Sequence, residues 1–277
     1  MTAAQALRDA ATRLAGVSIT ARLDAERLMA HALGVSRSEL LLRHMDGPVP
    51  AVFADLVERR AAHEPMGYLL GDESFHGLTF RVAPGVLIPR PDSEVLVDAA
   101  LACRPDARRV LDCGTGSGAL LLAVLVRLDT AQGIGVDRSP AALAIARANA
   151  KALGLEPRAR MELADWSEAG WADGLGGPFD LILANPPYVE SDAALEPSVR
   201  DYEPAGALFA GADGLDAYRV LLPQIPALLA PGGQALVEIG AAQADAVKAL
   251  SNAAGLSARL HRDLADRPRV MQLWHES

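Results

Sequence analysis

Phe179-Asp180-Leu181-Ile182-Leu183-Ala184-Asn185-Pro186-Pro187-Tyr188 is the stretch from which the fold can be worked out. Its first six residues form a short apolar run that predicts a buried strand. Two consecutive prolines can neither donate to a sheet ladder nor enter a helix, so they end the strand and hold an extended loop at its carboxyl end. In an open α/β sheet, ligands bind at this edge. The loop Asn185–Tyr188 is therefore a candidate binding site.

The groups in this loop suit a planar nitrogen group. The side-chain oxygen of Asn185 and the carbonyl of Pro186 can accept two N–H bonds from one –NH2 group. The flat ring of Tyr188 can lie over the plane of that group. Taken alone, the same four residues also fit an ordinary proline-rich turn that carries a packed tyrosine.

Strands and helices alternate on both sides of this loop. Strands are predicted at 109–112, 133–136, 158–163, 179–184, 234–239, 258–262 and 269–274. Helices are predicted at 95–102, 119–128, 139–153, 215–230 and 242–253, with Pro223 and Pro226 breaking or kinking the fourth. This alternation predicts an α/β fold with a mostly parallel, seven-stranded sheet.

The amino-terminal part of the chain differs in character. Residues 1–65 have helical periodicity and predict a small bundle of four helices, with Thr20 capping the second helix and Gly34 ending it. Glycines and prolines punctuate short apolar runs in residues 66–90, which predicts a β-hairpin linker. Residues 91–277 then form the main domain.

Composition narrows the function classes. The chain has 277 residues, of which 51% are hydrophobic, and a formal net charge of −9. No apolar run reaches membrane-spanning length and no signal sequence is recognisable, so neither a membrane nor a secretory role is expected. The two cysteines lack metal spacing, which favours a reducing cytoplasm. The acidic balance disfavours broad binding to nucleic acid.

A glycine-rich turn follows the first strand of the main domain. It reads Asp112-Cys113-Gly114-Thr115-Gly116-Ser117-Gly118, and Asp137 ends the next strand. Glycines let a backbone approach a ligand closely, and an acid roughly 20 residues further on is the usual partner of ribose hydroxyls. Gly114, Gly116 and Ala119 also satisfy a dinucleotide pattern, so NAD remains an alternative at this point.

Two further loops favour S-adenosylmethionine over NAD. Asp165 and Trp166 follow the third strand, where an acid and an aromatic ring can border an adenine. Asn185–Tyr188 follows the fourth strand, where a methyl acceptor would meet the sulfonium. Each of these residues also has an ordinary reading, as a turn or packing residue, and it is their order along the chain that supports the cofactor.

With these motifs, the chain resembles the class I methyltransferases that act on amino groups. When Phe75, Ile88–Glu94, Val199–Pro204 and the helical domain are included, nearly the whole chain resembles the peptide chain release factor glutamine methyltransferases. The resemblance implies a Rossmann-like fold and methyl transfer to the glutamine side-chain nitrogen in the Gly-Gly-Gln loop of release factors. The chain departs from the family at Cys113, where the family more often has an aliphatic residue.

The resemblance also assigns residues. It gives cofactor binding to Gly114, Thr115, Gly116, Ser117, Gly118, Asp137, Trp166 and Asn185, and the position of Asp165 after the third strand adds that residue. Catalysis falls to Asn185, Pro186 and Tyr188, and substrate binding to Asn185, Pro186, Pro187, Tyr188 and Phe75. The expected enzyme is a cytoplasmic monomer that needs no metal, uses release factors as its protein substrate and has no nucleic-acid or membrane partner. Its helical domain is expected to recognise the release factor.

The chemistry explains a neutral asparagine at the centre of the site. An amide nitrogen is a poor nucleophile because its lone pair is delocalised into the carbonyl. Accepting both of its N–H bonds favours a pyramidal nitrogen aimed at the methyl group, so positioning and electrostatics supply most of the catalysis. No strong base is required, because the N-methylated cation loses its proton readily.

A few residues keep two readings. Phe75 either clamps the substrate or packs in the hairpin core. Arg90 and Glu94 either order their loop or form a surface ion pair. Gly232-Gly233-Gln234 repeats the letters of the release factor motif but is expected to be a turn. Glu238 is expected to face inward at the end of its strand.

Three other functions remain open. A nucleic-acid methyltransferase acting on adenine or guanine would use the same Asn-Pro-Pro-aromatic loop, but the acidic balance and the absence of a basic arm argue against it. An NAD-dependent dehydrogenase would leave Asn185–Tyr188 without a role. A non-catalytic binding protein could keep the same fold.

Overall fold

The computed structural model describes residues 1–275, which divide into two compact units. One unit comprises Met1–Asp72 together with Leu195–Tyr202, and the other comprises Glu73–Ala194 and the chain from Glu203 onward. The first unit therefore extends beyond the expected boundary at residue 65. It also includes a short piece of chain that the sequence assigns to the main domain.

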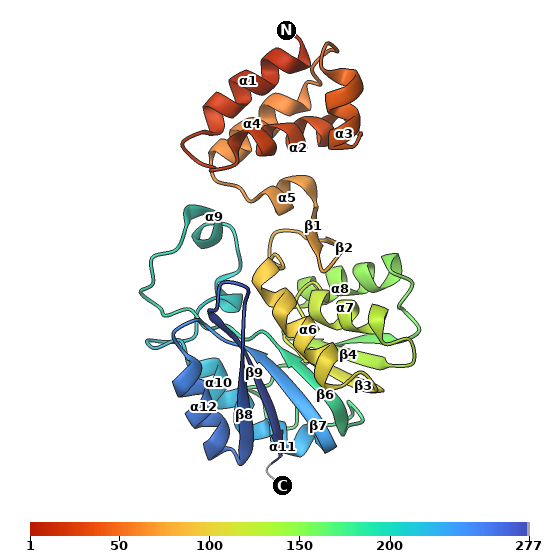
Figure 1. The fold of residues 1–277 in the computed structure, drawn as a ribbon, viewed down its shortest axis with the longest axis vertical. Coiled ribbons are helices and arrows are strands. Elements are labelled where there is room, and N and C mark those ends of the chain that lie inside the picture. Colours follow the sequence, from red (N-terminus) through yellow and green to blue (C-terminus); the bar gives the residue numbers. More distant parts are fainter. Residues whose placement is uncertain (276–277) are drawn as a thin grey trace. The chain divides into compact units, whose positions relative to one another are not determined.

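The first unit is built from helices (Figure 1). They are α1 (Ala3–Leu14), α2 (Ala21–Leu33), α3 (Arg37–Glu39), the π-helical turn η1 (Leu40–His44), α4 (Val52–Ala61), α5 (Met66–Leu70) and α9 (Pro197–Arg200). Gly34 ends α2 in the left-handed conformation, as expected. Thr20 does not cap that helix through its side chain, because its hydroxyl is bonded to Asp24 and Ser18 instead.

Residues 66–90 are only in part a hairpin. Residues 66–70 form the helix α5, and the hairpin consists of β1 (Asp72–Phe75) and β2 (Leu78–Arg81). His76 and Gly77 form its two-residue turn with φ angles of 50° and 75°, a conformation typical of tight hairpins. The sequence pattern does not reveal the helix because its few residues lie between a proline and a glycine.

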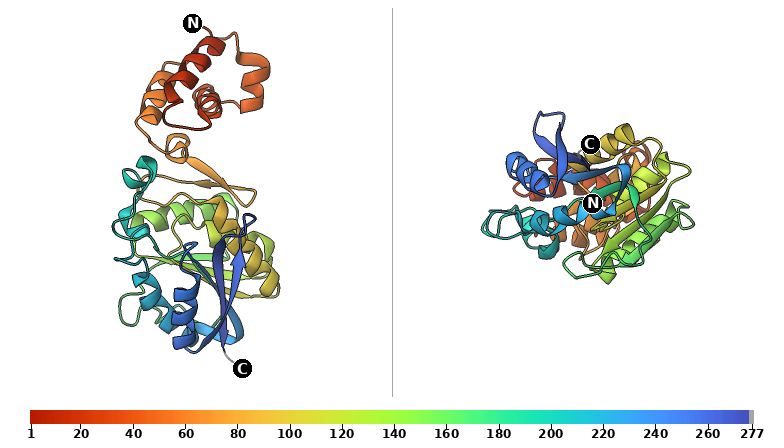
Figure 2. Two further views of the ribbon diagram at one scale, coloured as in Figure 1. Left: turned by 60° about the vertical axis from the view of Figure 1, so that its left-hand side comes forward. Right: turned by 90° about the horizontal axis from the view of Figure 1, so that it is seen from below.

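The second unit contains the seven-stranded sheet, and its class is confirmed. The strand order is β5-β4-β3-β6-β7-β9-β8. All neighbouring pairs are parallel except those made by β9, which runs antiparallel to β7 and β8. The strands are β3 (Arg109–Cys113), β4 (Gln132–Asp137), β5 (Ala159–Leu163), β6 (Phe179–Ala184), β7 (Leu229–Glu238), β8 (Leu256–Arg262) and β9 (Pro268–His275). Figure 2 shows the dark blue hairpin of β8 and β9 at one edge of this sheet.

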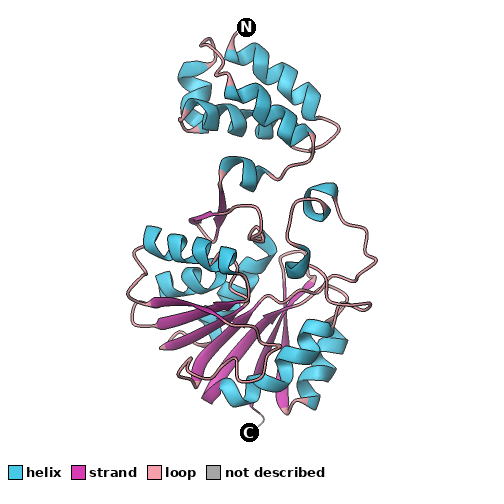
Figure 3. Ribbon diagram, turned by 180° about the vertical axis from the view of Figure 1, so that it is seen from behind, coloured by secondary structure: helices cyan, strands magenta, loops and turns pink. Residues whose placement is uncertain are grey.

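Helices cover both faces of the sheet (Figure 3). On one face lie α6 (Glu94–Cys103), α7 (Ala119–Arg127) and α8 (Pro140–Ala152), preceded by the 3-10 turn η2 (Pro91–Ser93). On the other lie α10 (Asp216–Leu221), η4 (Leu222–Gln224), α11 (Ile225–Leu228) and α12 (Ala244–Ala253). The expected break at Pro223 and Pro226 thus divides one predicted helix into three short elements.

Strand β6 shows why the sheet is buried on both sides. Leu181 and Leu183 pack into the core under α6 and α7, whereas Ile182 and Ala184 pack into the opposite core. This period of two is what a pleated strand between two helical layers requires. Among the described residues 1–275, no helix is long and apolar enough to cross a membrane.

The strand order brings the predicted loops together. β3 pairs with β4 on one side and β6 on the other, and Cys113 is the register partner of both Val136 and Ala184. The loops that begin at Gly114 and Asn185 therefore leave the sheet side by side. This reversal of strand order is the point where open α/β sheets bind ligands.

Candidate functional site

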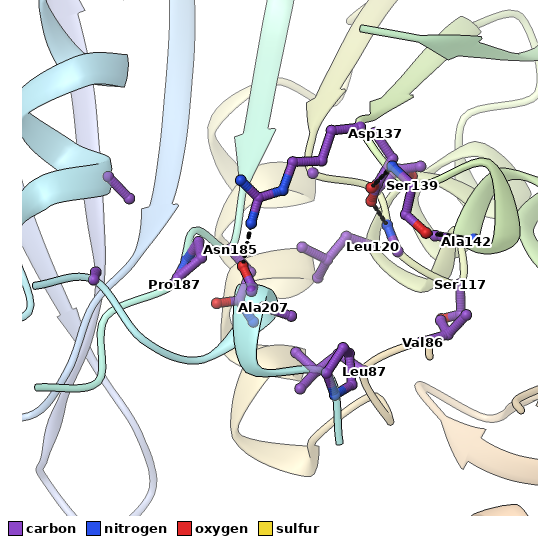
Figure 4. A pocket seen from close by; sticks show the side chains of 18 of the residues that line it. Val86, Leu87, Ser117, Leu120, Asp137, Ser139, Ala142, Asn185, Pro187 and Ala207 are labelled. Atoms are coloured by element: carbon purple, nitrogen blue, oxygen red, sulfur yellow. Dashed lines mark hydrogen bonds between the residues drawn. The ribbon is translucent and has the colours of Figure 1, made fainter. Parts of the chain in front are cut away.

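A cavity of about 530 Å³ lies at this edge of the sheet (Figure 4). Its volume is in the range of small-molecule sites. Asn185 and Pro187 line one wall of the cavity, and Asp137 and Ser139 line another. The remaining lining comes from Phe75, residues 85–90, Ser93, residues 114–117, Ala119, Leu120, Arg138, Ala142, residues 164–167, Pro204, Gly206, Ala207, residues 209–211, Asp216, Ala217 and Val220.

The glycine-rich turn is fixed from beneath and from the side. The Thr115 hydroxyl donates to Asp112 Oδ2 at 2.6 Å, and Asp112 is fully buried. Burial raises the pKa of Asp112 to about 7. The backbone N–H of Gly116 donates to Asp137 Oδ2 at 2.9 Å. The turn is therefore held against the end of β4, as a preorganised ligand cradle requires.

Asp137 is held in place by two backbone donors. Its Oδ2 accepts from Gly116, and its Oδ1 accepts from the backbone N–H of Ser139 at 2.8 Å. A carboxylate has about four acceptor positions, so two remain for a pair of hydroxyls. Figure 4 shows this side chain at the cavity with both bonds to the protein dashed. The geometry fits the expected contact to a ribose.

Trp166 lies against the glycine turn. A Cβ built on Gly114 would be 2.9 Å from Trp166 Cη2, so the ring occupies the space that a side chain would need. The carbonyl of Trp166 accepts from Gln224 Nε2 at 3.0 Å. Asp165 closes a tight turn, because its Oδ1 accepts from the backbone and the hydroxyl of Ser167. These bonds hold the pKa of Asp165 below its ordinary value.

The loop Asn185–Tyr188 is divided between the cavity and the core. Asn185 and Pro187 line the cavity, whereas Pro186 and Tyr188 are not among its lining residues. The Tyr188 ring packs against the core that contains α10 and α12, and burial raises the pKa of its hydroxyl to about 12. The Tyr188 carbonyl accepts from Gln243 Nε2 at 3.0 Å, which fixes the end of the loop.

Phe75 packs in the core of the hairpin, as one of its two expected readings has it, and it also reaches the cavity. It is 1% exposed and packs edge-on against Phe80, with ring centroids 6.1 Å apart. The same side chain also lines the cavity. It is therefore a core residue whose surface forms part of the cavity wall.

Arg90 and Glu94 do not form an ion pair with each other. Arg90, which lines the cavity, pairs with the buried carboxylate of Glu203. Glu203 also accepts from the backbone N–H of Ile88 at 3.3 Å. Glu94 accepts from the backbone N–H of His76 at 2.7 Å. Both side chains order the loop, each through a partner that the sequence does not reveal.

Ser93, Glu203 and the segment 204–211 are cavity residues or supports that the sequence motifs do not assign. Ser93 and Glu203 lie in segments used for the family resemblance, but neither belongs to a local motif. Their roles arise from contacts such as that of Asn185 Nδ2 with Ser93 Oγ at 3.4 Å. Within residues 1–275, no group of three histidine, cysteine or acidic side chains could hold a metal ion.

Comparison with known proteins covers both units. A model of the PrmC N-terminal domain matches residues 5–71, and a model of the methyltransferase domain matches residues 105–264. The release factor glutamine methyltransferase of Cereibacter sphaeroides is 46% identical, over 98% of each chain. That of Caulobacter vibrioides is 43% identical, over 90% of this chain and 88% of its own.

Solved structures share the fold at lower identity. A methyltransferase from Pyrococcus furiosus has a TM-score of 0.54 at 18% identity and covers 71% of this chain and 88% of its own. A ribosomal protein L11 methylase from Lactobacillus delbrueckii subsp. bulgaricus has a TM-score of 0.51 at 20% identity, with 72% and 86% covered. These likenesses concern the arrangement of sheet and helices.

Proposed function

Because the chain belongs to the release factor glutamine methyltransferase family, we propose that it methylates the side-chain nitrogen of the glutamine in the Gly-Gly-Gln motif of release factors. The methyl donor is S-adenosylmethionine. One observation at the site carries the proposal: Asn185 begins its loop beside the glycine turn, since Cys113 and Ala184 are register partners. A planar nitrogen held by Asn185 would thus lie next to the cofactor turn.

The residues of the cavity fit this cofactor. S-adenosylmethionine supplies an electrophilic methyl group on a sulfonium. Residues 114–117 of the turn provide close backbone approach, whereas Gly118 is not a lining residue. Asp137 has free acceptor positions for ribose hydroxyls, and Trp166 provides an aromatic wall. Asp165 and Asn185 complete the lining of the proposed cofactor site.

In this proposal, Asn185 and Pro186 orient the substrate amide. The Asn185 oxygen accepts one N–H and the Pro186 carbonyl accepts the other, which directs the nitrogen lone pair towards the methyl group. Among residues 1–275, no backbone donor is bonded to the Pro186 carbonyl. Pro187 and Phe75 would contact the flat face of the amide. The buried ring of Tyr188 would hold the loop from behind and take part in catalysis only indirectly.

We further propose that the helical unit selects the release factor. A glutamine side chain offers too little surface for selection, so a second surface is required. The helical unit has its own core, which includes Leu7, Leu28 and Phe53. It also exposes Ile19 and Leu42, at 106% and 81% relative accessibility. A net charge of −9 supports a protein partner rather than nucleic acid, and we place the enzyme in the cytoplasm as a monomer.

A labelling experiment tests the function. The protein is incubated with methyl-labelled S-adenosylmethionine and either an intact release factor or bulk nucleic acid. We expect label only on the release factor, on the glutamine of its Gly-Gly-Gln motif. Label on adenine or guanine, with none on the release factor, would instead support the nucleic-acid alternative. Gel filtration at working concentrations tests the monomer.

A further inference from the structure

Behind the cavity wall lies a carboxylate to which neither the reaction nor the cofactor assigns a role. Glu238 ends β7 and is 1% exposed. Its place follows from the sheet, because Ala184 of β6 is the register partner of Val237. Asn185 and Glu238 are the next residues on the two strands, so they leave the sheet as neighbours.

Ser93 joins these two residues. The Asn185 amide nitrogen, Nδ2, lies 3.4 Å from Ser93 Oγ. The side chains of Ser93 and Asn185 lie near enough to the Glu238 carboxylate to oppose, as hydrogen-bond donors, the rise of its pKa on burial. Asn185 and Ser93 line the cavity, whereas Glu238 lies behind them and is not part of the lining. The three side chains therefore form a cluster with the carboxylate on its inner side.

The orientation of the amide follows from the geometry. Nδ2 is the end of the Asn185 amide that lies at Ser93 Oγ, on the side of Glu238, and an amide NH2 group can only donate hydrogen bonds. The oxygen end must then face the other way. The two ends of an asparagine amide are nearly equal in shape. Without a neighbouring acceptor, either end could therefore face the cavity. A flipped Asn185 would present donors to a substrate –NH2 group, which is itself a donor.

We propose that Glu238, together with Ser93, is a positioning residue that fixes the Asn185 side-chain oxygen towards the substrate amide. This inference rests on the proposed function, since it concerns how that same site holds its glutamine. It gives a role to a carboxylate that occupies a position where an apolar side chain of the same size would pack. Among the described residues, Glu238 Oε2 has no hydrogen-bond partner, an arrangement that is unfavourable for folding.

Two substitutions separate positioning from packing. Glu238→Met removes the acceptor but keeps a side chain of similar length. Glu238→Gln keeps one acceptor oxygen and should restore much of the activity. We expect Glu238→Met to lower the single-turnover rate of methyl transfer at least about tenfold at saturating cofactor, with the Kd for S-adenosylmethionine unchanged. Tyr218→Phe is the matched control, because it removes a 2.9 Å bond to the backbone carbonyl of Glu238 and leaves its carboxylate in place.

A double-mutant cycle with Asn185→Ala decides the question. If Glu238 acts through Asn185, adding Glu238→Met to Asn185→Ala should cause no further loss, because residues that act as one unit are not additive. A multiplied loss in the double variant, or a near wild-type rate for Glu238→Met alone, would overturn the inference. Should Glu238→Met fail to fold, the same cycle is run with Ser93→Ala and read in the same way.

The rate of methyl transfer to a release factor by the wild-type protein shows whether a negative result contradicts this inference alone or the proposed function as well. A wild-type protein that binds the cofactor but transfers no methyl group to a release factor contradicts the proposed function and, with it, this role of Glu238. Normal wild-type transfer with an additive cycle contradicts the role of Glu238 only.

Discussion

The indole ring of Trp166 occupies the place of the missing side chain of Gly114. A Cβ on Gly114 would lie 2.9 Å from Trp166 Cη2 and 3.0 Å from Cζ3, and Gly114 has a φ of +76°. Two separate physical requirements thus disfavour any other residue there. The contact joins the loop after β3 to the loop after β5, on the two sides of β4.

Gly114→Ala should weaken binding of S-adenosylmethionine by at least about tenfold. The added methyl group meets the ring and also imposes left-handed strain on a side chain, which typically costs about 1–2 kcal/mol per residue. Gly154→Ala is the matched control, since Gly154 has a φ of +70° and open space around its Cβ position. Calorimetric titration should show a lower affinity for the first variant only, and equal affinities would remove the contact from the binding site.

Asp137→Ala should also weaken cofactor binding while the protein stays folded. The loss of a partner of desolvated hydroxyls costs ~1–3 kcal/mol. The variant also releases the backbone N–H groups of Gly116 and Ser139, so the loss should lie towards the upper end of this range. Asp129→Ala, at an exposed acid, is the control. A Kd that does not change on titration would contradict the cofactor assignment.

Asn185→Ala should lower turnover about 10²–10³-fold, the usual effect of removing one preorganised hydrogen bond at a reacting centre. Asn185→Asp keeps an acceptor oxygen, but it places a second carboxylate beside Glu238. Like charges in one buried cluster disfavour each other, so we expect Asp to be nearly as poor as Ala. Single-turnover methylation at saturating cofactor measures both variants. Near wild-type turnover of Asn185→Ala would make the loop structural and the proposed mechanism wrong.

Glu238 should make stability depend on pH. Burial raises the pKa of Glu238 from an ordinary 4.5 to about 7, with Asp92 adding to the effect, while bonds from Ser93 and Asn185 and the charge of Arg269 oppose it. The folded state therefore binds this proton more tightly than the unfolded state, and stability is lost as the pH rises from about 4.5 through 7.

Glu238→Gln should consequently melt higher than the wild type at pH 8, by about 2–4 °C for each kcal/mol gained. The difference should shrink as the pH falls towards 5. Asp112, whose pKa burial also raises to about 7, is present in both proteins, so the comparison isolates Glu238. Thermal unfolding at the two pH values provides the measurement. A gain that is equal at both would show that the carboxylate is not held at a raised pKa.

Removing the first 64 residues, which form most of the helical unit, should separate recognition from cofactor binding. Deletion of residues 1–64 is expected to leave the Kd for S-adenosylmethionine largely intact and to abolish methylation of intact release factor. A short Gly-Gly-Gln peptide should be methylated equally, and poorly, by both proteins. Tyr202→Phe controls for the lost 2.8 Å bond from Tyr202 to the Ala62 carbonyl, and should keep most of the activity. Full activity of the truncated protein on intact factor would contradict the recognition role.

The sequence by itself determined most of the helices and strands of the main domain. It also determined that the candidate site residues follow the carboxyl ends of the strands. The period of two in β6, the glycines after β3 and the prolines after β6 are local signals, because each acts on backbone conformation within a few residues. Parallel strands place their carboxyl ends at one edge of the sheet. The candidate loops at Gly114, Asp137, Asp165 and Asn185 are therefore expected at a common site from the order of the strands and loops along the chain.

Two short segments could not be assigned correctly from the sequence pattern. The helix at residues 66–70 escapes prediction because its span is too short for a periodic pattern to be seen. Gly232-Gly233-Gln234 is expected to be a turn, and the structure includes it in β7 at a register irregularity, where Gly232 has a φ of +74°. The segment thus matches the Gly-Gly-Gln motif of release factors in sequence only, because here it is part of a strand.

Only the tertiary structure decided which of these residues touch. The strand order pairs Cys113 with Ala184, and Ala184 with Val237. The same order places Glu238 beside Asn185. Arg90 finds Glu203 across more than a hundred residues of chain, and the Tyr188 ring turns into the core rather than the cavity. The physical reason is that a side-chain pattern specifies the face of a strand that is buried, whereas its neighbour in the sheet is chosen by the packing of the whole domain.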